Sequence, residues 1–147
     1  MVSITATAGG RSSTIQAKRP LFSELWKYYP VKMPASDVYS MVGGQAIALY
    51  QENPTGYANA CALRLSRSFN YGGMPIKQST RGYKVRGADH KPYLLRVREM
   101  ITFVEQNLGN ADLSFKPQNN QDLSSQLKGK KGIIVFKVSG WGDASGH

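Results

Sequence analysis

The chain has 147 residues, which fits one domain with its own hydrophobic core and excludes enzymes whose two domains close over a cofactor. Hydrophobic residues make up 41% and aromatic residues 10%, a composition typical of globular rather than disordered proteins. Nineteen lysines and arginines against nine acidic residues give a net charge of +10, which favours anionic partners. The single cysteine, Cys61, excludes a disulfide within the chain and a zinc site built from several cysteines.

The N-terminal residues and the apolar runs bear on localisation. The longest apolar run, Ile133 to Phe136, is far shorter than the about 18 residues that span a bilayer, so no membrane span is expected. The first twenty residues lack the apolar stretch of a secretory signal, and export is expected to use a route without a cleaved signal. Residues 1–19, rich in Ser, Thr, Ala and Gly without a period, are predicted to form a flexible arm before a single domain over residues 20–147.

Helical patterns dominate the first part of this domain. Apolar residues recur at helical spacing from Phe22 to Tyr29, and Pro30 ends that helix. Ser36 and Asp37 are capping residues for a second helix, which the Gly43-Gly44 pair interrupts or closes. Residues 46–50 continue the helical pattern beyond the glycines.

The middle of the chain combines a helix with a basic loop. Asn59 is a capping residue for a helix that ends at Gly72-Gly73, so Cys61 is predicted in its first turn. Residues 72–92 lack helical periodicity and are rich in lysine and arginine, which is typical of a basic loop that can include short strands.

The last elements indicate the fold class. Residues 93–96 are predicted as a brief strand, and the apolar spacing from Val97 to Leu108 predicts a helix that ends at Gly109. GIIVFKV, Gly132 to Val138, is predicted as a buried strand. Because helices come first and strands gather late, the expected class is α+β.

Cys61 is the sharpest candidate for chemistry. The positive end of a helix and its free backbone N–H groups stabilise a thiolate, which a cysteine nucleophile needs. The alternative is that Cys61 is a small buried hydrophobic residue, the commoner role of a lone cysteine.

A cysteine nucleophile usually needs a histidine as base, and the chain offers two. His90 lies among cations and fits a surface loop, whereas His147 follows the predicted strand and a Gly-rich turn that could return it to a sheet end. A third group must orient the imidazole; Asp143 and Asp89 are weak candidates, so the triad is incomplete.

The basic residues support a competing, non-catalytic function. Seven cations and one acid lie between Lys77 and Arg98, and Tyr71, Tyr83 and Tyr93 could stack on bases. No helix-turn-helix spacing, zinc-ligand set or RNA-binding consensus accompanies them, so a nucleic acid partner is disfavoured. A basic protein that binds an anionic polymer, either nucleic acid or cell-wall glycan, remains the alternative.

Three blocks carry a family resemblance: GYANACALRLSRSFNYGG, RGADHKPYLLRV and GKKGIIVFKVSGWGDASGH. From about Pro20 onward the chain resembles the fourth family of type VI secretion amidase effectors, which are papain-like cysteine amidases related to NlpC-class cell-wall peptidases. The resemblance implies N-terminal helices packed on an antiparallel sheet, with Cys61 as nucleophile and His147 as general base and acid. The third acid and the last strands of the family lie beyond His147, so the chain is expected to be C-terminally shortened.

The implied function is that of an antibacterial toxin. It would hydrolyse the γ-D-glutamyl–meso-diaminopimelate amide of peptidoglycan stem peptides, with no metal or organic cofactor. Arg64 is a candidate ligand for stem-peptide carboxylates. The implied partners are the stem peptide, a cognate immunity protein and the secretion apparatus. The protein is expected to be made in the producer's cytoplasm and to act in the periplasm of a target cell.

Overall fold

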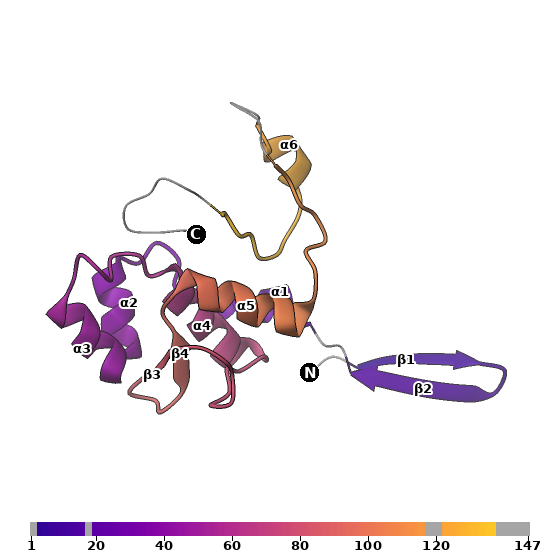
Figure 1. Cartoon of the computed structure of the whole chain (residues 1–147). Helices are drawn as coiled ribbons and strands as arrows, with labels where there is room; N and C mark the ends of the chain where they lie inside the picture. The colour runs from indigo at the N-terminus through magenta and orange to yellow at the C-terminus, as the bar shows by residue number, and fades with distance from the viewer. Residues whose placement is uncertain (1–2, 17–18, 117–121, 138–147) are drawn as a thin grey trace.

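The structure is a computed structural model that describes residues 3–16, 19–116 and 122–137. It combines helices with two small antiparallel sheets, which confirms the α+β class (Figure 1). Within the described residues, no helix has the length and apolar character needed to cross a membrane.

The N-terminal segment forms a hairpin of β1 (Ser3–Ala8) and β2 (Arg11–Gln16). Gly9 and Gly10 both have positive φ, 57° and 74°, as the favoured two-residue hairpin turn requires. Threonine and serine side chains pair across the strands, for example Thr5 Oγ1 with Thr14 Oγ1 at 2.8 Å. The sequence predicted no regular structure here because these strands are too polar for an apolar alternation. The hairpin extends away from the helices in Figure 1 and contacts no other described element.

The helical body is built around α4 (Cys61–Gly72). Helix α1 (Phe22–Tyr28) lies along it, and Gly72 allows the contact, since a Cβ there would come within 2.9 Å of Leu25 Cδ2. The Ser68 hydroxyl donates to the Leu25 carbonyl at 2.5 Å and joins the two helices further.

The Gly43-Gly44 pair separates α2 (Ala35–Val42) from α3 (Gly44–Glu52), which confirms the predicted interruption. Gly44 has a φ of 57°, and a Cβ there would lie 2.6 Å from the Arg86 carbonyl oxygen. Only glycine allows this close approach, so α3 begins directly against the backbone of the second sheet.

The second sheet pairs β3 (Lys84–Arg86) with β4 (Pro92–Leu94), and Val85 lies opposite Tyr93. Helix α4 replaces a third strand: the Ser66 hydroxyl accepts from the Leu94 N–H at 2.9 Å and donates to the Leu94 carbonyl at 3.1 Å. The Asn70 amide donates to the Pro92 carbonyl at 2.8 Å. These bonds satisfy buried polar groups and fix α4 on the sheet.

Two hydrophobic clusters flank α4, and each includes residues of the helix itself. The first joins α2, α3 and the sheet, with Val38, Tyr39, Leu63 and Tyr93 at its centre. The second joins α1 and α5 (Val97–Leu108), with Leu25, Phe69, Leu94, Met100 and Phe103. Helix α4 is therefore the central element of the core.

The predicted C-terminal strand is wrong for residues 132–136, whereas Lys137 forms an isolated β-bridge. Ile134, Val135 and Phe136 are 51%, 39% and 48% exposed and are not in a strand. An apolar run becomes a strand only beside a partner strand, and neither described sheet extends to this segment. Between it and α5 lies the single-turn helix α6 (Ser124–Leu127). Val138 lies outside the described residues.

Tyr39 gives a test of the first cluster. Its side chain is fully buried against Tyr50 and Tyr57, and its hydroxyl has no hydrogen-bond partner among the described residues. Burial, with the neighbouring Tyr57 and Tyr50, raises the pKa of Tyr39 to about 12. The free energy of unfolding of the wild type should therefore be highest below pH 10 and fall as the pH rises from about 10 towards 12. The reason is that the phenol ionises at a lower pH in the unfolded chain than in the folded protein.

Tyr39→Phe should remove that alkaline loss. At neutral pH it should leave the free energy of unfolding unchanged or raise it by about 1 kcal/mol, because it deletes an unsatisfied buried hydroxyl. Urea unfolding at neutral and alkaline pH measures both effects. A loss of more than about 1 kcal/mol at neutral pH would show that the hydroxyl is bonded.

Candidate active site

Cys61 is the first residue of α4, as the sequence predicts. Ala60 occupies the N-cap position, and the Asn59 side chain accepts the Cys61 backbone N–H at 3.1 Å. Asn59 therefore caps the helix through its side chain, although it lies one residue before the N-cap position. The thiol is placed at the positive end of a twelve-residue helix.

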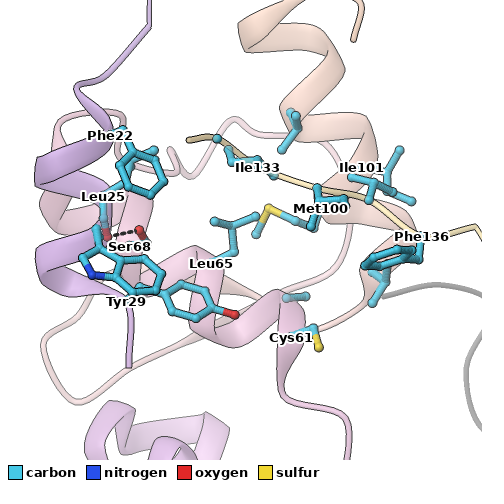
Figure 2. Close-up of a pocket in the computed structure, with 17 residues that line it drawn as sticks. Phe22, Leu25, Tyr29, Cys61, Leu65, Ser68, Met100, Ile101, Ile133 and Phe136 are labelled. Atoms are coloured by element: carbon cyan, nitrogen blue, oxygen red, sulfur yellow. Dashed lines mark hydrogen bonds between the residues drawn. The ribbon is translucent and has the colours of Figure 1, made fainter. Parts of the chain in front are cut away.

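A mainly apolar cavity of about 300 Å³ lies beside Cys61. Its walls come from α1, α4, α5 and the segment 132–136 (Figure 2). Cys61 lies at one end of the cavity, with Tyr29 and Phe136 on either side of it in Figure 2. The Tyr29 hydroxyl points toward this end. The exposed apolar residues 134–136 therefore form one wall of a cavity.

Two opposing effects set the acidity of the thiol. Burial raises the pKa of Cys61 above its ordinary value, and the positive charge of Arg64 opposes this. The pKa of Tyr29 is also raised, first by burial and then by the Cys61 charge, while Arg64 lowers it. Cys61, Tyr29 and Arg64 are therefore electrostatically coupled.

Arg64 is half-buried and bonded to the backbone of another segment. Its Nη1 donates to the Pro30 carbonyl at 2.7 Å and its Nη2 to the Met33 carbonyl at 2.5 Å. Each terminal nitrogen thus makes one bond to the backbone and keeps a second N–H. Binding of a substrate carboxylate by Arg64 stays a prediction.

Asp89 belongs to a different cluster. Its Oδ2 accepts from the Tyr71 hydroxyl at 2.6 Å and from the Tyr93 hydroxyl at 2.7 Å. Burial alone would raise the pKa of Asp89, but these bonds and the Lys91 N–H and charge hold it below its ordinary value. Tyr71 is in the last turn of α4, about 15 Å along the helix from Cys61, so the structure does not bring Asp89 to the thiol.

The structure also limits the predicted stacking surface. Tyr93 is fully buried, so it cannot stack on a base. Arg67 and Lys91 make cation–π contacts with the Tyr71 ring, at 4.8 Å and 5.4 Å from its centroid. Arg96 makes the same kind of contact with the Tyr83 ring at 4.9 Å. The rings of Tyr71 and Tyr83 are therefore already in contact with cationic side chains of the same chain.

The other candidates are placed as follows. His90 is exposed, with a φ of 63°, in the turn between β3 and β4. His147 and Asp143 lie outside the described residues. No group of three metal-ligating side chains occurs in the described part of the chain. The helical spacing of Tyr29 predicts only a core residue, and no local signal in the sequence marks it as part of the site.

Comparison with known proteins places the chain in a family. The sequence model of "type VI secretion system (T6SS), amidase effector protein 4" matches residues 57–147, a segment that contains Cys61, Arg64 and His147. No curated protein matches the chain.

Solved structures give the same result. The effector–immunity system Tae4/Tai4 from Salmonella typhimurium is similar at 39% identity and a TM-score of 0.73, over 88% of this chain and 80% of that one. The Tae4–Tai4 complex from Enterobacter cloacae is similar at 35% identity and a TM-score of 0.75, over 88% and 78%. The Tae4 effector of E. cloacae has the same identity, coverage and TM-score. The chain therefore belongs to the family of type VI secretion system amidase effector protein 4.

Proposed function

We propose that this protein is an antibacterial effector in which Cys61 hydrolyses the amide between γ-D-glutamate and meso-diaminopimelate in peptidoglycan stem peptides. The observation that carries the proposal is the position of Cys61, which begins α4 at the end of a cavity and lies inside the segment that matches an amidase family. A helix start beside a cavity suits a nucleophile better than a packing residue.

The reaction would follow the chemistry of cysteine hydrolases. His147, assigned by the family resemblance, takes the thiol proton, and the Cys61 thiolate attacks the amide carbonyl carbon. The Ala62 and Leu63 N–H groups in the first turn of α4 have no partner within the helix and are suited to stabilise the oxyanion, whereas the Cys61 N–H is bonded to Asn59. His147 then protonates the departing amine of diaminopimelate as the C–N bond breaks, leaving a thioester on Cys61. Water, deprotonated by His147, cleaves the thioester and restores the thiolate.

The relatives support the proposed partners. The similar structures from both organisms include effector–immunity systems, and one pairs the effector Tae4 from S. typhimurium with the immunity protein Tai4 from E. cloacae. We therefore propose a cognate immunity protein for this chain as well. Delivery would use the type VI apparatus, and the site of action would be the periplasm of the target cell.

Mass spectrometry of digested Gram-negative sacculi tests the proposed bond. The protein should release fragments with a new γ-D-glutamyl carboxyl terminus and a new diaminopimelate amine, and Cys61→Ala should release none. Cleavage at another bond would correct the specificity. Binding to sacculi without cleavage by the folded protein, weakened steeply by salt, would favour the non-catalytic basic protein instead.

A further inference from the structure

Arg64 combines a fixed position with nearness to the nucleophile. It follows Cys61 by three residues on α4, so the two side chains lie one turn apart on the same helix face. Bonds of 2.7 Å and 2.5 Å to the Pro30 and Met33 carbonyls hold its guanidinium. A free arginine samples many rotamers, whereas two bonds to fixed acceptors keep this charge in one place.

The same bonds act on the wall of the cavity. Pro30 and Met33 belong to the segment between α1 and α2, and Tyr29 directly precedes Pro30. The Tyr29 N–H donates to the Trp26 carbonyl at 3.2 Å, and the next residue, Pro30, accepts from Arg64. Tyr29 and Cys61 line the same cavity, and the Tyr29 hydroxyl points toward the Cys61 end (Figure 2).

Among the described residues that line the cavity, Tyr29 is the titratable side chain besides Cys61. The cavity-lining residues of α5 are apolar, namely Val97, Met100, Ile101 and Val104. The segment 132–136 contributes only glycine and apolar side chains. Tyr29 directly follows α1, and on α4 the charged neighbour of Cys61 is Arg64. A cation held near a half-buried thiol favours its thiolate form.

We propose that Arg64 is a positioning residue for the Cys61 thiol: it keeps a fixed positive charge one helical turn along α4 from Cys61 and holds the Pro30–Met33 backbone that follows Tyr29. The proposal rests on the proposed function of Cys61 as the nucleophile. It differs from substrate binding, because the guanidinium acts through the thiolate and the Pro30–Met33 backbone rather than through a ligand.

Alkylation by iodoacetamide tests this without any peptidoglycan. This reagent is small and neutral, so its rate reports the thiolate of Cys61 and not binding of a charged ligand. The rates are measured by mass spectrometry of the intact protein from about pH 6 to about pH 9, around the ordinary cysteine pKa. The variants are Arg64→Gln and Arg67→Gln, which remove the same charge from the same helix; Arg67 lies over the Tyr71 ring instead.

Arg64→Gln should slow alkylation at pH 7 by about three- to tenfold and move the pH profile upward, since one pKa unit changes the thiolate fraction about tenfold. Arg67→Gln should leave the profile unchanged. An unchanged profile in folded Arg64→Gln, or equal shifts in both variants, would overturn the proposal. A raised KM on sacculi with unchanged alkylation would establish substrate binding by Arg64 instead.

Arg64→Lys keeps the positive charge, and it provides the test if Arg64→Gln does not fold. A lysine cannot span the two carbonyls as the guanidinium does, so alkylation should slow more than in Arg67→Lys. Equal alkylation rates in Arg64→Lys and Arg67→Lys would show that the two bonds of Arg64 to the Pro30 and Met33 carbonyls do not position the thiol, and would overturn that part of the proposal. If the parent protein cleaves no sacculi but Arg64→Gln still slows alkylation relative to Arg67→Gln, the result counts against the proposed function alone, which keeps the two proposals separable.

Discussion

Replacement of Cys61 by alanine is expected to reduce hydrolysis of peptidoglycan by at least about 10³-fold, since loss of a covalent nucleophile leaves only binding and oxyanion stabilisation. Release of stem-peptide fragments, quantified by chromatography over time, measures the effect. The loss should appear in kcat rather than in KM, because the thiol acts in bond making and not in ground-state binding.

The fold should tolerate this change. Cys61 is only half-buried and lies at the helix end, so loss of its sulfur costs little packing. The circular dichroism spectrum and the melting temperature of Cys61→Ala should match those of the parent protein. Cys61→Ser is the second control, because its weaker nucleophile has nearly the same size. Substantial activity in either folded variant would exclude Cys61 as the nucleophile.

Replacement of Phe69 by alanine is expected to lower the free energy of unfolding by about 3–5 kcal/mol. Phe69 is fully buried on α4 and packs edge-to-face on Phe103 of α5 at 5.3 Å between ring centroids. Its removal leaves a void where α4 and α5 meet, in addition to the lost burial of the ring. Urea unfolding followed by circular dichroism measures the change.

Tyr83→Ala is the matched control for this loss. Tyr83 is 43% exposed and contacts Arg96 through its ring, so its truncation should cost about 1 kcal/mol or less. A Phe69→Ala effect no larger than that of Tyr83→Ala would mean that α4 and α5 do not pack as described.

The sequence could predict α4 and the place of Cys61 because the signals are local. Asn59 stands just before the helix, the Gly72-Gly73 pair ends it, and an apolar face lies between them. The break at Gly43-Gly44 was equally readable. These features depend on neighbouring residues only.

The remaining features depend on residues distant in the chain. The bonds of Arg64 to Pro30 and Met33 cross more than thirty positions, and no spacing rule links them. The same holds for Ser66, whose hydroxyl completes the edge of β4 from a helix. The apolar run Ile134–Phe136 predicts a strand that the structure does not have, because an apolar run alone does not specify a pairing partner.

The side-chain anchors of α4 also govern which parts of the molecule can open separately. Ser66, Ser68 and Asn70 tie the helix to β4 and α1, so α4 cannot slide without breaking hydrogen bonds on two sides. The middle and last turns of such a helix are expected to open only together with the core. The hairpin β1–β2 has no such ties to the body and can open without it. Cys61 begins this anchored helix, so the position of α4 relative to β4 and α1 is set independently of the β1–β2 hairpin.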